Sequence, residues 1–444
     1  MKNVLKYILT FVLMVIMALG LLLVSSCIPR VFLRNNVRIS ANELKRENEK
    51  FIVRSFDKRL LFHNSTDAIM INITYGIDEN DKLESVIKAR RNYIPGIKQD
   101  IVEDKNGNLV TSNNKKFSMV KELNELVNNN EEQDVLEYVR YWHGYVVILR
   151  ILLVFFDILQ IRIIFQLMLY AFLALLMVFL FKKNKGFDAI LVLLSFVILD
   201  ISTWENNIQG MFVMLISVLV SLLIVKEKIS KNNFTYSMFI TGAVVAYLDF
   251  LTVPLVSLLM PLIIYNIVNE DNESLKELLI RFIKVTISWG IGYIGLWAAK
   301  WVITDMIYGT DMIKLGLNQI LIRSGINEEN IKFIPFALKA VKNNVLCING
   351  AIMWIVLIII GITTAIYGFK NGIRIFINKE NLIYFISILS VYAWYIIFAN
   401  HSEMHYFFTY RLQLVSVLSL LLITLGSIIK NLNKNKDKKV DVND

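Results

Sequence analysis

The sequence predicts an all-α polytopic membrane protein with about ten transmembrane helices and a small extracytoplasmic α or α+β cap in the first outer loop. Three observations predict this fold class. Hydrophobic residues make up 56% of the 444-residue chain, and its mean hydropathy is +0.54. Apolar stretches of membrane-spanning length recur along the whole chain, and Lys and Arg residues gather between them. A soluble protein of this length could not bury so much apolar surface.

Along the chain, segments rich in Lys and Arg alternate with loops that have neither. The inner segments carry nineteen Lys and Arg residues, whereas the outer loops 204–207, 249–252 and 400–410 carry none. Because positively charged loops stay in the cytoplasm, this asymmetry places both termini inside a multi-pass cell-membrane protein. The net charge of +10 comes from these clusters and a Lys-rich tail. This pattern is typical of membrane topology and contact with anionic lipids, and not of nucleic-acid binding.

The apolar and polar stretches divide the chain into consecutive parts. We expect the first transmembrane helix in residues 1–27, the extracytoplasmic cap in 28–143 and an outer interfacial helix in 144–160. Transmembrane helices 2–7 follow in 161–303, an outer loop with amphipathic helices in 304–344, transmembrane helices 8–10 in 345–429, and a Lys-rich cytoplasmic tail in 430–444. The fifth and sixth helices are separated at 249–254, where Pro254 cannot donate a backbone hydrogen bond.

The stretch 145–181 does not divide simply into spans. Its 37 positions are nearly all apolar, too many for one transmembrane helix and too few for two. If the first part crossed the membrane, every later loop would change side and the Lys clusters would face outward. The sequence therefore predicts that Tyr145–Leu159 lies along the outer surface.

Two cysteines, Cys27 and Cys347, are too few for a disulfide framework or a cysteine metal site. Cys27 ends Val24-Ser25-Ser26-Cys27, which resembles a lipoprotein cleavage box. The apolar run before it is longer than a usual signal core, so an uncleaved first helix is the favoured interpretation.

Polar residues that suggest chemistry lie on the outer side. All four histidines, His63, His143, His401 and His405, fall there. Asp249 stands in a tight turn between two spans, where its carboxylate could bind a divalent cation or a sugar hydroxyl, or simply cap a helix. The sequence identifies no cofactor beyond that possible cation. His401 and His405 are four residues apart, as metal ligands on a helix can be, but a polar lip of a cavity is the favoured interpretation.

The layout of the chain resembles the GT-C class of lipid-linked-sugar glycosyltransferases. The shared features are an inner N-terminus, a large first outer loop, interfacial helices and many spans. The resemblance implies a polyprenyl-phosphate-linked sugar donor and a catalytic acid in the first outer loop, where Asp67 is the candidate. The paired acidic signature common after the first helix is absent, and Ile28-Pro29-Arg30 stands there instead. The strings Arg140–Gly144 and Leu149-Arg150 also resemble uncharacterised bacterial multi-spanning proteins.

These observations predict one outer-facing cavity. Its catalytic carboxylate would be Asp67 or Asp249, which would accept a proton from the acceptor hydroxyl. Arg150 and Arg411 would hold the donor's phosphate. The remaining predicted substrate-binding residues are His143, Asp200, Glu205 and His405.

The favoured function is therefore transfer of a polyprenyl-phosphate-linked sugar to a cell-envelope glycan or lipid on the outer face. Membrane lipids, this donor and an envelope glycan acceptor would be its partners. Two alternatives remain open. A transporter or lipid flippase would place polar groups at the membrane midplane, and a non-catalytic envelope-assembly protein would need no such site.

Overall fold

We describe the protein from a computed structural model. The structure describes residues 2–47, 51–53, 59–61, 64–93, 101–103, 109–111, 119–128, 134–269, 273–325, 333–348 and 350–440. His63 and the side chain of Glu205 lie outside the described part of the chain. Helices dominate the described residues, and the strands among them have three or four residues each. The predicted all-α class is confirmed.

The first part of the chain forms one long helix and a small mixed region. Helix α1 covers Lys2–Ser26. The elements that follow are α2 (Arg30–Glu47), β1 (Phe51–Val53), β2 (Arg59–Leu61), α3 (Asn64–Tyr75), α4 (Lys82–Lys88), β3 (Arg90–Tyr93), β4 (Ile101–Glu103), β5 (Leu109–Thr111), α5 (Met119–Asn128) and β6 (Asp134–Glu137). Three antiparallel pairs, β1–β2, β3–β6 and β4–β5, account for the strands. Helices α2, α3 and α5 pack together around buried side chains such as Leu33, Ala68 and Leu123.

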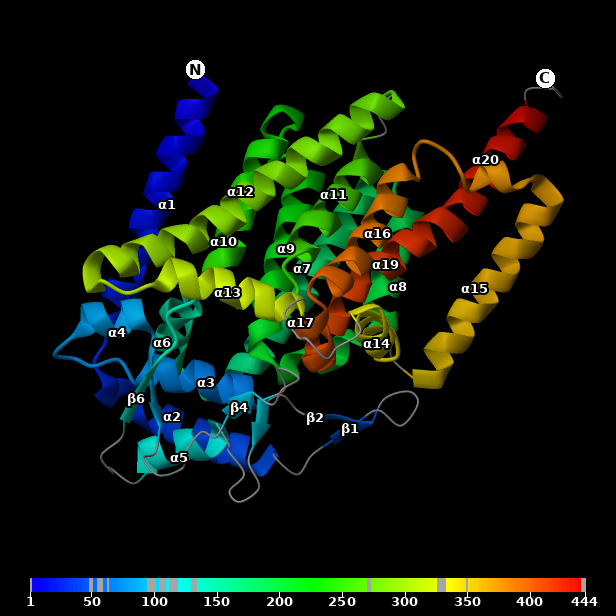
Figure 1. Ribbon diagram of the computed structural model, residues 1–444. Helices are drawn as coiled ribbons and strands as arrows, with labels where there is room; N and C mark the ends of the chain where they lie inside the picture. The colour runs from blue at the N-terminus through cyan, green and yellow to red at the C-terminus, as the bar shows by residue number, and fades with distance from the viewer. Residues whose placement is uncertain are drawn as a thin grey trace.

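The rest of the chain is a helical bundle. Its elements are α6 (Tyr145–Phe155), α7 (Ile158–Lys182), α8 (Gly186–Ile198), η1 (Ile201–Asn206), α9 (Ile208–Val225), η2 (Lys231–Asn233), α10 (Phe234–Leu248), α11 (Val256–Val268), α12 (Leu275–Tyr308), α13 (Met312–Ser324), α14 (Phe333–Val345), α15 (Gly350–Asn371), η3 (Ile373–Ile375), α16 (Leu382–Ile397), α17 (Ala399–Met404), α18 (Tyr406–Thr409), η4 (Tyr410–Leu412), α19 (Gln413–Leu421), the π-helical η5 (Leu422–Gly426) and α20 (Ser427–Val440). Figure 1 shows both termini at one end of the bundle and the α2–β6 region at the other.

Six of these helices are long and apolar enough to cross a membrane: Val4–Ser26, Ile158–Lys182, Ile208–Val225, Leu275–Tyr308, Met353–Asn371 and Tyr406–Asn435. Shorter apolar helices cover Tyr145–Phe155, Gly186–Ile198, Val256–Val268 and Leu382–Ile397. Helices α1 and α15 expose rows of large apolar side chains, whereas α9 and α11 are almost wholly buried. A protein that exposes apolar helices of this length on its outside has the character of a membrane protein.

The long apolar stretch after residue 144 is broken into two helices. Helix α6 has 11 residues and is therefore about 16 Å long, half the thickness of the hydrocarbon core. Asp157 then caps α7 through hydrogen bonds from the backbone N–H groups of Leu159 and Gln160. Helix α7 thus begins at Ile158, so the first turn of this helix lies inside the predicted interfacial segment 144–160. That α6 lies at the membrane surface stays a prediction.

Two glycines allow α10 and α12 to pack closely. A Cβ atom on Gly242 would lie 2.2 Å from the carbonyl oxygen of Trp289, and one on Gly292 would lie 2.0 Å from that of Phe239. Only residues without side chains permit such an approach of two backbones. This contact fixes the position of α12, which carries much of the cavity described next.

Candidate functional site

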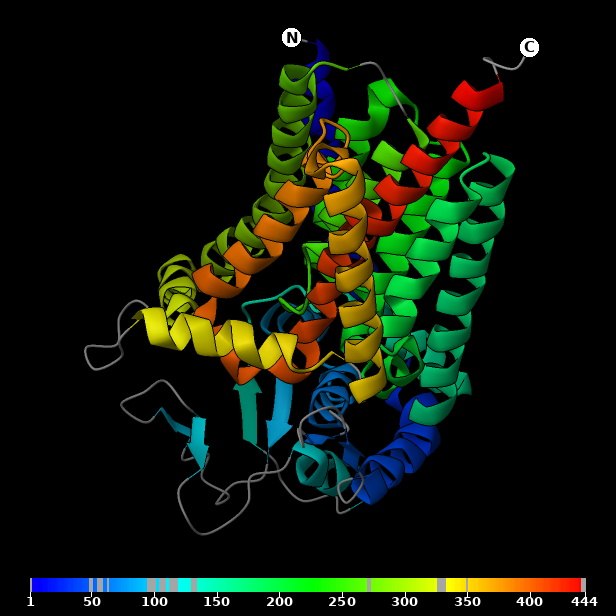
Figure 2. The ribbon, with the colours of Figure 1, turned by 90° about the vertical axis from the view of Figure 1, so that its right-hand side faces the viewer.

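A cavity of about 510 Å³ lies between α12, α13 and α16. Figure 1 shows α13 lying across the bundle near the end that faces the α2–β6 region, and Figure 2 shows the yellow helix α14 crossing at a similar level. The cavity is lined by Arg140, Tyr141, Leu251, Trp289, Tyr293, Ile294, Trp297, Ala298, Trp301, Val302, Ile313, Gly316, Leu317, Gln319, Ile320, Arg323, Trp394 and Phe398. Most of these side chains are apolar or aromatic, and two are arginines. Such a cavity fits an amphiphile with a long apolar part and a negatively charged end.

An aromatic ladder on α12 forms one wall. Trp289, Tyr293, Trp297 and Trp301 follow one another at intervals of four residues, so they share one face of the helix. Their successive ring centroids lie 4.9, 5.3 and 6.2 Å apart. Against the far end of the ladder, Gly316 of α13 packs directly under the Trp301 ring. The ladder gives the cavity a rigid wall that suits isoprenoid chains and sugar rings alike.

Several hydrogen-bond donors in this wall are unused among the described residues. The hydroxyl of Tyr293 and the indole nitrogens of Trp297 and Trp394 are buried without a partner there. A buried donor without a partner is unfavourable, so each of these groups could be satisfied by a ligand's oxygen atoms. The indole of Trp301 instead donates to the carbonyl oxygen of Arg140 at 3.0 Å and holds that arginine's backbone at the cavity.

The turn after α10 lies behind the cavity. Asp249 accepts hydrogen bonds from the backbone N–H and the hydroxyl of Thr252, and it is 1% exposed. Burial raises the pKa of Asp249 to about 7, although the bonds from Thr252 act in the opposite direction. The bonds hold a turn in which Leu251, a residue that lines the cavity, has φ 67°. This left-handed conformation is strained for a branched side chain.

His401 of α17 connects this turn to α13. One guanidinium nitrogen of Arg323 lies 2.5 Å from Nδ1 of His401, and Nε2 of His401 lies 2.7 Å from the carbonyl oxygen of Leu251. Because arginine only donates and a carbonyl only accepts, His401 must be neutral with its proton on Nε2. Burial, followed by the nearby charge of Arg323, holds the pKa of His401 well below its usual value.

His143 supports the other side of the cavity wall. Its Nε2 lies 2.8 Å from the carbonyl oxygen of Tyr138 and its Nδ1 lies 3.0 Å from the hydroxyl of Tyr145. The ring contacts Tyr141, which lines the cavity, and Phe250. Burial lowers the pKa of His143 to about 3, so the imidazole stays neutral. His143 therefore positions Tyr141 and does not itself line the cavity.

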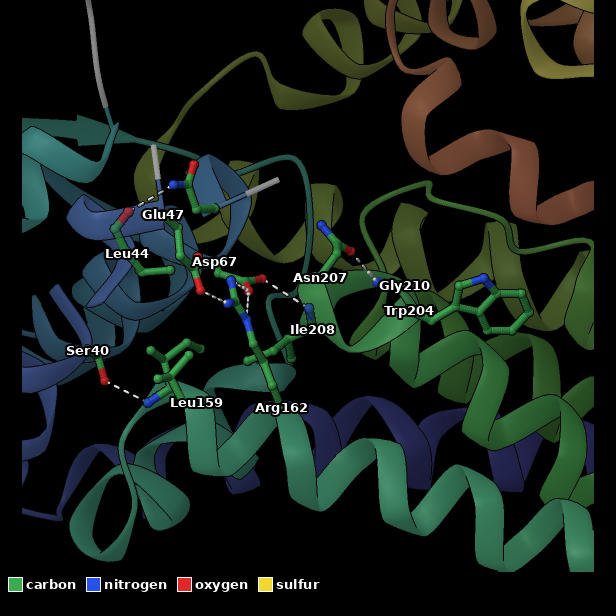
Figure 3. Close-up of polar contacts among 12 residues, drawn as sticks. Ser40, Leu44, Glu47, Asp67, Leu159, Arg162, Trp204, Asn207, Ile208 and Gly210 are labelled. Carbon is green, nitrogen blue, oxygen red and sulfur yellow. Dashed lines mark hydrogen bonds and ion pairs between the residues drawn. The ribbon is translucent and has the colours of Figure 1, made fainter. Parts of the chain in front are cut away.

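Asp67 lies in a separate buried cluster. Figure 3 shows Arg162 of α7 reaching between Asp67 of α3 and Glu47 of α2. Nε of Arg162 donates to Asp67 at 2.9 Å, and the backbone N–H of Ile208, at the start of α9, donates to the other carboxylate oxygen at 3.1 Å. Burial raises the pKa of Asp67 to about 6, against the attraction of Arg162. The cluster joins the α2–β6 region to two bundle helices, which is a structural role.

Arg150 also has a structural role. Its guanidinium donates to the carbonyl oxygen of Ile28 at 2.5 Å and to that of Thr74 at 2.6 Å, and its side chain is fully buried. These bonds connect α6 to the end of α1 and the end of α3. A guanidinium that is occupied by backbone carbonyls leaves little capacity for a phosphate.

The remaining predicted site residues lie elsewhere. Arg411 packs against Gly210 and over the ring of Trp204, with a donor 3.4 Å from the Trp204 carbonyl oxygen. Asp200 accepts a hydrogen bond from the hydroxyl of Ser202 in the turn before η1. The ring of His405 stacks on Phe408.

The predicted site residues that the structure describes do not line the Trp-lined cavity. None of the predicted site residues whose side chains are described, namely Asp67, His143, Arg150, Asp200, Asp249, His405 and Arg411, lines the 510 Å³ cavity. Asp249 and His143 lie directly behind its wall, Asp67 is bound by Arg162 and Ile208 of the bundle, and Arg150 donates to the carbonyl oxygens of Ile28 and Thr74. Position near the end of a helix does not determine which way a side chain points, so it does not by itself place a residue in this cavity.

The residues that do line the cavity were partly visible in the sequence. The interval of four between Trp289, Tyr293, Trp297 and Trp301 marks one face of a single helix and could have identified the wall. Arg323 carried no such signal, because it ends a short amphipathic segment like many surface arginines.

Within the described part of the chain, no three His, Cys, Asp or Glu residues gather as ligands for a metal ion. Neither Cys27, which is exposed, nor Cys347, which is buried, forms a disulfide bond.

A second cavity, of about 300 Å³, lies at the other end of the bundle and is lined by residues of η3, η5 and α20. Its wall mixes Arg374, Lys430 and Lys434 with Asp188 and Glu380, and Lys430 pairs with Glu380 at 3.2 Å. Opposite charges of this kind are typical of hydrated helix ends, so the Trp-lined cavity is the better candidate site.

Comparison of the chain with protein-family models, curated proteins and solved structures finds no match.

Proposed function

We propose that the protein is a membrane glycosyltransferase that uses a polyprenyl-phosphate-linked sugar to modify a cell-envelope glycan or lipid on the outer face. The observation that carries the proposal is the Trp-lined cavity of about 510 Å³ with arginines in its wall. An isoprenoid phosphate is apolar along its chain and anionic at one end, and the cavity offers complementary groups for both parts.

The proposed topology has about ten spans, with both termini in the cytoplasm. The six long apolar helices are six of these spans, and α8, α10, α11 and α16 are the other four. The arrangement of the ends supports this topology, because the termini lie at one end of the bundle and the α2–β6 region at the other. The α2–β6 region is then the extracytoplasmic cap, α6 lies at the outer interface, and the cavity opens near the outer leaflet.

The cavity residues have distinct proposed tasks. The aromatic ladder contacts the isoprenoid chain, and Arg140 and Arg323 bind the phosphate through charge-assisted hydrogen bonds. The unused donors of Tyr293, Trp297 and Trp394 bind oxygen atoms of the sugar or the phosphate. Arginine suits this task better than lysine because its planar donors can bind two phosphate oxygens together.

Asp249 is the better of the two candidate bases. Asp249 lies two residues before Leu251, which lines the cavity, and a pKa of about 7 suits a group that accepts a proton near neutral pH. Asp67, by contrast, is bound by Arg162 and Ile208. Because Asp249 is buried behind Leu251, an acceptor reaches it only when the strained turn 249–252 opens.

The test uses a deletion strain complemented with the full-length gene. Mass analysis of envelope glycans and lipid-linked sugars should show one product lost in the deletion strain, its lipid-linked precursor accumulated, and both restored by the wild-type chain. Arg323→Gln and Asp249→Asn should fail to restore the product. Lys314→Gln is the matched control, because it removes a positive charge from the same helix at a residue that does not line the cavity.

Two results would contradict the proposal. Unchanged glycans and lipid-linked sugars in the deletion strain would exclude the glycosyltransferase function. Full activity of Asp249→Asn would exclude Asp249 as the base while leaving the donor site intact.

A further inference from the structure

We infer that His401 is a positioning residue that holds Arg323 in the cavity wall, ready to bind the phosphate of an isoprenoid phosphate. The inference rests on the proposed function, because it assigns the phosphate-binding group of that donor site. Its basis is the pair of hydrogen bonds that His401 makes, one to Arg323 and one to the carbonyl oxygen of Leu251.

Two consecutive residues of α17 form hydrogen bonds with the end of α13. His401 accepts from Arg323, and the amide of the neighbouring Asn400 donates to the carbonyl oxygen of Ile322 at 3.0 Å. Helix α13 ends there, since Gly325 has φ 72°. The last turn of α13 is thus fixed both at its backbone and at the Arg323 side chain.

The chemistry of the contact favours an anion-binding arginine. An arginine side chain loses about 2 kcal/mol of rotamer entropy when it is ordered, so ordering it beforehand strengthens binding. A neutral imidazole orders Arg323 without cancelling its charge, whereas a carboxylate in the same place would neutralise it. Within the described part of the chain, no carboxylate forms an ion pair with Arg323. A guanidinium has five N–H donors, so donors remain for a phosphate.

The other bond of His401 connects Arg323 to a second residue of the cavity wall. Leu251 lines the same cavity, and its carbonyl oxygen receives the Nε2 proton of His401. The ring of His405 lies 4.8 Å from that of His401 and Phe408 lies 6.1 Å from it. His401 is 3% exposed and is not among the residues that line the cavity, but both residues that it holds are.

The experiment measures ligand binding by the fluorescence of the cavity tryptophans. The purified full-length chain in detergent is titrated with farnesyl phosphate, with farnesol and with inorganic phosphate. The variants are His401→Phe, which keeps a ring but removes both hydrogen bonds, His401→Gln, which keeps a donor and an acceptor, and the control Lys314→Gln. Thermal melting of each variant checks that it folds.

We expect the wild type to prefer farnesyl phosphate to farnesol and to bind inorganic phosphate weakly. His401→Phe should weaken farnesyl phosphate binding about tenfold, the effect of one charged hydrogen bond, and leave farnesol binding unchanged. His401→Gln should recover most of the loss. In an Arg323→Gln background, His401→Phe should have no further effect on the preference for the phosphate.

Different failures are distinguishable. If the wild type binds farnesol as tightly as farnesyl phosphate, the donor site of the proposed function is wrong. If the wild type prefers the phosphate but His401→Phe keeps that preference, or weakens both ligands equally, His401 is not a positioning residue. Should His401→Phe fail to fold, His401→Leu, which also removes both hydrogen bonds, and its double variant with Arg323→Gln decide the same question.

Discussion

Replacing Asp249 with Asn removes a charge from a buried turn and leaves its shape almost unchanged. The side-chain oxygen of the substituted amide can still accept the bond that Thr252 donates from its backbone N–H. The groups that hydrogen-bond to the native carboxylate are neutral, and burial makes ionisation of this carboxylate unfavourable. The substitution therefore isolates the free energy of ionising this group inside the folded protein.

The magnitude follows from the pKa. A pKa raised from 3.8 to about 7 in the folded protein corresponds to about 4 kcal/mol against the ionised form. Below about pH 4 the carboxyl is protonated in both the folded and the unfolded chain, so it does not reduce stability. As the pH rises from about 4 to about 7, the unfolded chain ionises first and the wild type loses stability. Above about pH 7 the loss is complete.

Asp249→Asn does not ionise, so it should become more stable than the wild type as the pH rises. Thermal melting in detergent at intervals from pH 4.5 to pH 8 measures this difference. We expect the melting temperature of the variant to exceed that of the wild type by several degrees at pH 8 and by less at pH 4.5. Thr252→Val is the informative companion, because it removes the hydroxyl that lowers the pKa of Asp249 and should steepen the pH dependence.

A constant difference between Asp249→Asn and the wild type across this pH range would refute the reasoning. So would a loss of stability in the variant that grows with pH, because it would mean that the ionised carboxylate stabilises the fold. The double variant Asp249→Asn with Thr252→Val should show no steepening. Persistence of the Thr252→Val effect in the double variant would assign it to packing.

Three further predictions concern the fold and its orientation. Arg162→Met leaves two carboxylates buried without their cation and should destabilise the protein by about 3–5 kcal/mol, seen as a lower melting temperature. Gly292→Leu should prevent the close contact of α10 and α12, because its Cβ would lie 2.0 Å from the Phe239 carbonyl oxygen, whereas Gly290→Leu meets nothing within 4 Å and should melt like the wild type. A cysteine introduced at Asn106 in a background lacking the native cysteines should react with an impermeant thiol reagent on intact cells; reaction only after lysis would invert the proposed topology.

Much of the bundle could be predicted from the sequence because hydropathy is local. The apolar runs around α1, α7, α9 and α12 stand out residue by residue, and the break between α10 and α11 follows from Asp249 and Pro254. Helix α7 begins at Ile158, a few residues before the predicted start of the second span at 161, because the capping box at Asp157 determines where the helix begins. Caps depend on single side chains, which a hydropathy average does not register.

The candidate site was predicted less well, because it depends on which side chains meet. The sequence has charged residues near the predicted outer ends of the helices, and we expected residues at the same depth in the membrane to lie close together. In the structure Arg150 is bound by the carbonyl oxygens of Ile28 and Thr74, and Asp67 by Arg162. A buried charge must be satisfied by its nearest partner, and that partner is determined by helix rotation and tilt.

By itself the sequence determined that the described chain is helical, where its apolar segments begin and end, and how positive charge alternates between their ends. These properties arise from residues that are neighbours in the chain. Only the tertiary structure decided that His401 meets Arg323, 78 positions away, and Leu251, 150 positions away. Contacts over such distances depend on how whole helices pack, and packing is fixed by shape, as where Gly242 and Gly292 let α10 and α12 touch. Hydropathy is the same for many ways of packing the same helices, so it cannot select the one that forms the cavity.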